Sequence, residues 1–129
     1  MKIHHAAVWL DHSEARVFHI EKKGFDETHV QADKPHQHLH RKSGPGAVSG
    51  KRAHVDPDYY EDICKSLGAA DEILILGPST AKLELIKHVH KKHPDLTDRV
   101  VGVETVDHPS AGQIVAYARK YFDKVDNGS

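Results

Sequence analysis

A short apolar run followed by a Gly-Pro break and an amphipathic helix constrains the fold most. Ile73–Leu76 contains only apolar residues, which is typical of a strand buried on both faces. Gly77 and Pro78 end this run, and Ser79 is a suitable N-cap because its hydroxyl can accept a free backbone N–H of the first helical turn. Apolar residues then recur at helical spacing, at Leu83, Leu85, Ile86 and Val89. A buried strand that leads through a tight turn into a helix predicts an α/β architecture.

The length and composition of the chain predict one cytoplasmic domain. The 129 residues are enough for one domain with a hydrophobic core and too few for two ordinary ones. No apolar run approaches the roughly 20 residues of a membrane-spanning helix, and the N-terminus lacks the apolar core of a signal peptide. The single cysteine, Cys64, excludes an internal disulfide and fits a reducing compartment. We expect one domain over residues 1–123 and a polar tail over 124–129.

Three strands are expected before the central one. Residues 4–11 and 14–21 carry apolar side chains on both faces. Residues 25–32 are more polar, so this strand is expected at an edge of the sheet. The connections at 12–13 and 22–24 are short, and short connections join antiparallel neighbours. The first three strands are therefore expected to form an antiparallel meander.

Three helices and a last strand complete the pattern. The first helix is expected to begin at Pro57, after the N-cap Asp56, and to stop at Gly68. After the central strand and its helix, residues 99–106 predict a final strand, and Ser110 with Gln113 forms a capping box for the last helix. Right-handed crossovers place the later strands parallel to one another beside the first strand. The expected fold is a three-layer α/β structure with a mixed five-stranded sheet.

The strongest functional signal is an acid-free segment between the third strand and the first helix. Residues 34–54, called the basic segment below, carry a net charge of +5, so the rest of the chain carries −6. Cations on a Gly/Pro-rich segment suit contact with phosphates, because each neutralised phosphate releases a condensed counterion. We predict RNA binding here. The expected RNA-binding residues are Lys34, His36, His38, His40, Arg41, Lys42, Gly44, Gly46, Lys51 and Arg52.

The 13 histidines raise the question of a metal site. His36, His38 and His40 would share one face of an extended segment, and imidazole is a common ligand of zinc, copper and nickel. Histidines 88, 90 and 93 lie on or near one helix, but the first two do not face the same way. No Cys-x-x-Cys or His-Glu-x-x-His pattern accompanies them. We therefore expect no metal site, with the three histidines of the basic segment as the weak candidates.

No catalytic residue is predicted. A carboxylate nuclease would need acids that converge on divalent ions; Asp11, Glu72 and Asp107 are candidates, but as ordinary acids at strand ends they are better explained. The stretch 77–82 is not a Walker A loop, because it lacks the second glycine and the Lys-Ser/Thr pair. Cys64 lies on the apolar stripe of its helix, which favours a place in the core over a role as nucleophile.

In their order and spacing these segments resemble the middle domain of the archaeal and eukaryotic peptide-chain release factors and of their ribosome-rescue relative Pelota, in a compact bacterial form. The likeness covers most of the chain: the leading strands, the basic segment, a helix, residues 72–85, and residues 103–108 that lead into the last helix. The more specific parts are the strand–Gly–small residue–helix pattern of 72–85 and the later pair Val106-Asp107. The resemblance implies the ribonuclease-H-like fold of the translational machinery components, which agrees with the mixed sheet inferred above.

The resemblance also bears on activity. In the release factors this loop carries Gly-Gly-Gln, which enters the peptidyl-transferase centre and helps water to cleave peptidyl-tRNA. Here the corresponding residues 42–50 read Lys-Ser-Gly-Pro-Gly-Ala-Val-Ser-Gly. Pelota also lacks the tripeptide and acts in rescue without hydrolysis. The resemblance thus implies a translation-associated protein that binds the ribosome, rRNA or tRNA, without hydrolytic activity and without a cofactor.

Three alternatives stay open at this point. A histidine of the basic segment could replace the glutamine, since histidine acts as a general base near neutral pH; the chain would then be a peptidyl-tRNA or RNA hydrolase. The histidine content also fits a metal-binding or metal-buffering protein. The third alternative is an interaction module that forms a homodimer through an edge strand.

Overall fold

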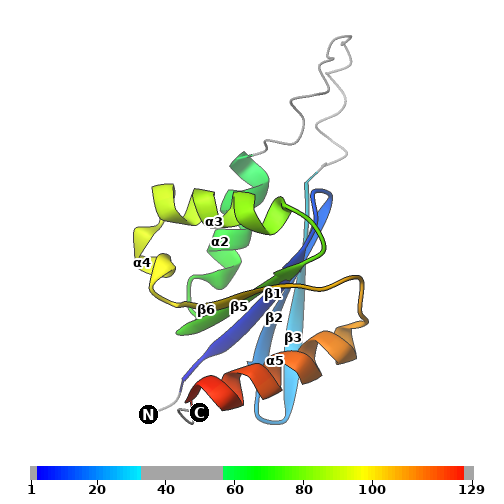
Figure 1. The fold of residues 1–129 in the computed structure, drawn as a ribbon. Coiled ribbons are helices and arrows are strands. Elements are labelled where there is room, and N and C mark those ends of the chain that lie inside the picture. Colours follow the sequence, from blue (N-terminus) through cyan, green and yellow to red (C-terminus); the bar gives the residue numbers. More distant parts are fainter. Residues whose placement is uncertain (1–2, 33–56, 127–129) are drawn as a thin grey trace.

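The computed structural model describes residues 3–32 and 57–126, whose five strands form one mixed sheet in the order β3-β2-β1-β5-β6 (Figure 1). The first three strands pair antiparallel, while β5 pairs parallel with both β1 and β6. The central strand of the sequence, β5, therefore lies directly beside the first strand, as the crossover rule predicts. The strand bounds are β1 His5–Leu10, β2 Glu14–Glu21, β3 Gly24–Gln31, β5 Glu72–Gly77 and β6 Val100–Thr105.

Helices cover both faces of the sheet, which gives the predicted three layers (Figure 1). Helices α2 (Pro57–Leu67) and α3 (Ala81–Lys92) pack on one face, and α5 (Ala111–Asp126) packs on the other. A one-turn helix, α4 (Pro94–Thr97), follows α3 directly and was not expected from the sequence. Among the described helices, none combines the length and the apolar character that crossing a bilayer requires.

The two helical layers bury both sides of the central strands. Along β1, Val8 and Leu10 face the core under α2 and α3, whereas Trp9 faces the core under α5. Strand β5 alternates in the same way, with Ile75 on the first side and Leu74 on the second. Full burial of each such aliphatic side chain contributes about 1.5–3 kcal/mol to stability relative to exposure. This explains why the unbroken apolar run forms a central strand, while polar β3 lies at the edge of the sheet.

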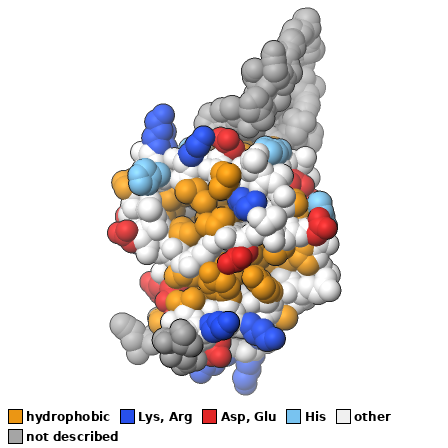
Figure 2. Space-filling model, viewed as in Figure 1, with side chains coloured by type: hydrophobic (Ala, Val, Ile, Leu, Met, Phe, Trp, Pro, Cys, Tyr) orange, Lys and Arg blue, Asp and Glu red, His pale blue; other side chains and the backbone are white. Residues whose placement is uncertain are grey.

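Apolar side chains also reach the surface beside the other edge strand. Figure 2 shows them gathered across the middle of the face seen in Figure 1, with charged side chains above and below. Strand β6 forms this edge, and its residues from Val100 to Glu104 are half-buried.

The predicted fold class is confirmed, and the differences are local. Thr80, not Ser79, is the N-cap of α3, and it makes no side-chain capping bond; its backbone carbonyl accepts the N–H of Leu83 instead. Leu83 was placed on the apolar stripe but is 49% exposed. Helix α5 continues to Asp126, so residues 124–126 of the expected tail are helical.

Candidate functional site

The basic segment lies outside the described residues, and so do all ten of its predicted RNA-binding residues. The structure does place the two points where the segment is attached to the domain. At the end of β3, the N–H of Ala32 donates to the carbonyl of Ser13 at 2.9 Å. At the start of α2, the hydroxyl of Tyr59 donates to the carbonyl of Asp11 at 2.8 Å. Both attachment points are therefore bonded to the same β1–β2 turn.

This turn is part of the sheet edge where the parallel strands end, which we call the carboxyl edge. It comprises residues 11–12 after β1, 77–80 after β5 and 107–108 after β6. In open α/β sheets, ligands usually bind outside the carboxyl ends of the strands. Ala32 and Tyr59, which flank the basic segment in the sequence, are both bonded to the turn that follows β1 and therefore lie at this edge.

The carboxylate of Asp11 holds the β1–β2 turn. Its Oδ1 accepts the backbone N–H groups of Ser13 and Glu14, at 2.8 and 3.0 Å. This is the Asx-turn arrangement that makes aspartate favourable in tight turns. Its other oxygen, Oδ2, lies 3.7 Å from Nε2 of His108. These contacts support the interpretation of Asp11 as a structural acid at the end of a strand.

A second part of the carboxyl edge is built around Trp9. The indole Nε1 donates to the carbonyl of Asp107 at 2.7 Å, and the ring lies 4.8 Å from the His108 ring, centroid to centroid. Behind them is a pocket of about 350 Å³ between β6 and the start of α5. Its lining is Leu76, Val106, Asp107, His108, Pro109, Gln113, Ile114 and Tyr117. The sequence did not single out this pocket, since its walls come from strand ends far apart in the chain.

The turn from 77 to 82 is built for packing and not for phosphate. Lys82 is 8% exposed, and its Nζ donates to the carbonyl of Ser79 at 2.6 Å. The ammonium group is thus bonded back to the backbone three residues earlier in the chain. Gly77 is required here because a Cβ at this position would lie 2.3 Å from the carbonyl oxygen of Leu10. The predicted side-chain cap of α3 is not formed, since the N-cap is Thr80 and its hydroxyl makes no capping bond.

The three candidate nuclease carboxylates do not converge. Glu72 pairs with His5 at the start of β1, at the end of the sheet opposite to Asp11. There, Nε2 of His5 lies 3.2 Å from Oε1 of Glu72 and donates to Oδ2 of Asp126 at 2.9 Å. Burial, together with the neighbouring Asp126 carboxylate, raises the pKa of Glu72. The side chain of Asp107, at the carboxyl edge, is 97% exposed.

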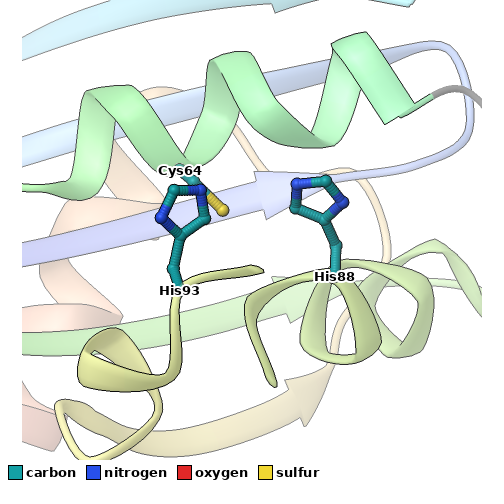
Figure 3. Close-up of side chains that lie close together, drawn as sticks. All are labelled: Cys64, His88 and His93. Atoms are coloured by element: carbon teal, nitrogen blue, oxygen red, sulfur yellow. The ribbon is translucent and has the colours of Figure 1, made fainter. Parts of the chain in front are cut away.

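A polar cluster lies between α2 and the end of α3; we call it the Glu61 cluster. Its members are Glu61, Cys64, His88 and His93, and Figure 3 shows the last three. Oε1 of Glu61 accepts from Nε2 of His88 at 2.9 Å and from Nε2 of His93 at 2.8 Å. The hydrogen bond from His88, then that from His93, lowers the pKa of Glu61 to about 2. Burial, aided by the Glu61 charge, raises the pKa of Cys64 to about 12.

Sequence reasoning noted these histidines but did not find the cluster. His88 and His90 face different ways, as expected, and His90 is exposed. His88 instead meets His93, which lies just beyond the last helical residue and has non-helical backbone angles of φ −138° and ψ 63°. The available signal was Glu61-x-x-Cys64, a spacing that places two ligand-type side chains on one face of α2. Nothing local predicts that this face packs against the end of α3.

Neither a protein-family model nor a curated protein sequence matches this chain. Several solved structures share its fold. Pelota of Archaeoglobus fulgidus matches with a TM-score of 0.63 at 10% identity over 93% of this chain and 32% of its own. The archaeal translation termination factor aRF1 matches with 0.55 at 12% identity, over 96% and 38%. Dom34 of S. cerevisiae, a translation termination-like factor involved in RNA quality control, matches with 0.55 at 13% identity, over 95% and 34%.

The chain spans about a third of the length of these proteins, so the likeness concerns one part of each. At sequence identities this low, the likeness shows a shared fold and does not assign substrates or partners. The resemblance inferred from the sequence is confirmed at that level: almost the whole chain has the fold of a domain of the Pelota and release-factor proteins.

Proposed function

We propose that this chain is a translation-associated protein that binds ribosomal RNA or tRNA through the basic segment and does not hydrolyse its partner. The observation that carries the proposal is an acid-free stretch of net charge +5 inserted into a fold shared with translation factors. The aRF1 and Dom34 structures are described as a termination factor and a termination-like factor, which makes the ribosome the partner to test first. The proposal includes the cytoplasmic location expected from the sequence.

The placement of the attachment points supports this function. The described residues on either side of the basic segment are bonded to the β1–β2 turn, by Ala32 to Ser13 and by Tyr59 to Asp11. The chain before and after the basic segment is thus anchored at the carboxyl edge, where ligands of open α/β sheets usually bind.

The decisive experiment is co-sedimentation of the full chain with ribosomes and isolated subunits over a salt series. A neutralised variant replaces Lys34, Arg41, Lys42, Lys51 and Arg52 with glutamine. A matched control replaces five exposed lysines outside the segment, namely Lys22, Lys23, Lys87, Lys91 and Lys120. Both variants lose the same charge, so a general electrostatic effect would weaken them equally.

We expect binding to be lost selectively in the neutralised variant. If all five cations contact phosphates, the slope of log K against log salt should fall by about 3.5 to 4.5. The control should keep the wild-type slope. Equal behaviour of the two variants, or an affinity and slope unchanged by neutralisation, would refute the role of the basic segment. Turnover of peptidyl-tRNA or structured RNA by the purified chain would favour the hydrolase alternative instead.

A further inference from the structure

We propose that Cys64, His88 and His93 bind a divalent transition-metal ion of the zinc class, with Glu61 as the fourth ligand. The proposal concerns the Glu61 cluster and is independent of RNA binding by the basic segment. It differs from the weak metal candidates of the sequence, because none of the ligands belongs to that segment.

The ligand atoms are already gathered. The Sγ atom of Cys64 and one ring nitrogen each of His88 and His93 lie within 4.8 Å of one another. Zn–N bonds of about 2.0–2.1 Å and a Zn–S bond of about 2.3 Å place tetrahedral ligand atoms roughly 3.3–3.6 Å apart. Shortening these separations by at most about 1.5 Å therefore closes the site around these three ligands. In Figure 3 the sulfur of Cys64 projects from α2 into the space between the two imidazole rings.

Glu61 supplies both a fourth ligand and the charge balance. Its Oε1 accepts from both Nε2 atoms, at 2.9 and 2.8 Å, so a carboxylate oxygen already lies beside the two imidazole ligands. On metal binding the Cys64 thiol releases its proton to solvent, each imidazole carries its single proton on the ring nitrogen that does not bind the metal, and the carboxylate moves to become a ligand. A thiolate, a carboxylate and two neutral imidazoles together carry −2, which a divalent cation neutralises. Such balance matters here because an unpaired charge is costly in a partly buried site.

The donor set selects the kind of metal. One sulfur and two nitrogens suit zinc and similar transition metals, whereas Mg²⁺ and Ca²⁺ prefer oxygen ligands. Cys64 is buried, while the side chains of Glu61 and His93 are 34% and 31% exposed, which leaves solvent access from one side. A bound ion would link α2 to the end of α3 through its ligands. It would thereby stabilise the helix that directly follows the basic segment.

The test is a titration of the full chain with Zn²⁺ and Co²⁺. Binding is measured by calorimetry and by the visible and near-ultraviolet spectrum of Co²⁺, and its effect on stability is measured by thermal unfolding. It is made in a background in which His36, His38 and His40 are replaced by asparagine, so that adventitious binding there does not contribute. The site variant is His88→Gln/His93→Gln, and its matched control is His29→Gln/His90→Gln, two exposed histidines outside the cluster. Circular dichroism of each metal-free variant confirms that it is folded.

We expect one ion per chain, a tetrahedral Co²⁺ spectrum with a thiolate-to-metal charge-transfer band, and a rise in Tm with Zn²⁺. The control should behave like the background, and the site variant should lose all three signals. Glu61→Gln should weaken binding by about tenfold to a hundredfold. Cys64→Ser should abolish the charge-transfer band. Stoichiometric binding that survives in the folded site variant, or the absence of binding in the background protein, would overturn the proposal.

Discussion

The replacement of Gly77 by alanine gives the sharpest test of the central turn. An added Cβ would lie 2.3 Å from the carbonyl oxygen of Leu10, whereas real Cβ atoms essentially never approach within 3.0 Å. Strands β1 and β5 must therefore separate by at least about 0.7 Å at this point. The atom that must move is backbone, and it belongs to the strand in the middle of the sheet.

The cost follows from this geometry. Overpacking of a filled core costs about 1–3 kcal/mol, and weakening one ladder hydrogen bond between the two strands adds about 0.5–1.5 kcal/mol. We expect Gly77→Ala to lower the free energy of unfolding by about 2–4 kcal/mol, given these two contributions. Equilibrium urea unfolding, followed by circular dichroism and by the fluorescence of the single tryptophan, measures this difference.

Gly112→Ala is the matched control, because it makes the same chemical change where a Cβ meets nothing within 4 Å. Gly112 lies in the first turn of α5, so alanine should stabilise the protein by up to about 1 kcal/mol through its higher helix propensity. The two substitutions are expected to have opposite signs. A Gly77→Ala variant that unfolds at the wild-type urea concentration would show that the close approach to Leu10 does not exist.

The other predictions concern single contacts and use the same unfolding assay. Trp9→Phe should lower the free energy of unfolding by about 2–3 kcal/mol, because it leaves a cavity and removes the hydrogen bond to the carbonyl of Asp107. Its unfolding is monitored by circular dichroism, since this variant has no tryptophan. A loss below about 0.5 kcal/mol would contradict that contact. Ser110→Ala should cost about 1 kcal/mol by removing the N-cap of α5, and Ser110→Asp should restore most of it. Glu72→Gln should stabilise the protein at pH 7. Because burial and Asp126 raise the folded pKa of Glu72 above its ordinary 4.5, the charged form destabilises the fold; this penalty is absent below pH 4.5 and grows as the pH rises through the folded pKa. The gain in stability from Glu72→Gln should therefore shrink on acidification. A gain that is the same at pH 7 and below pH 4.5 would argue against a raised pKa of Glu72.

Short-range patterns predicted most of the fold. The capping box of Ser110 and Gln113 forms with both reciprocal bonds, at 2.9 and 3.2 Å, because capping depends only on residues three apart. The run Ile73–Leu76 forms the buried strand between the first and last strands, since only a central position covers both of its faces. The predicted cap of α3 by Ser79 was wrong: the N-cap is Thr80, which makes no side-chain capping bond, and the buried Ser79 hydroxyl has no hydrogen-bond partner in the described part of the chain. A hydroxyl residue satisfies the local rule, whereas the bond itself depends on the backbone of the turn.

Of the two candidate sites, the basic segment was predicted from the sequence and the Glu61 cluster was found only in the structure. The sequence by itself determined the basic segment, because net charge needs no tertiary contact, and its RNA-binding residues stay a prediction outside the described part of the chain. Only the tertiary structure showed that Ala32 and Tyr59, on either side of that segment, are bonded to the turn at Asp11, and that Glu72 lies away from the carboxyl edge. It alone brought Glu61 and Cys64 to His88 and His93. Local rules reach three or four residues along a helix, whereas these contacts join residues about 30 positions apart, whose meeting depends on how α2 and α3 pack on a common sheet.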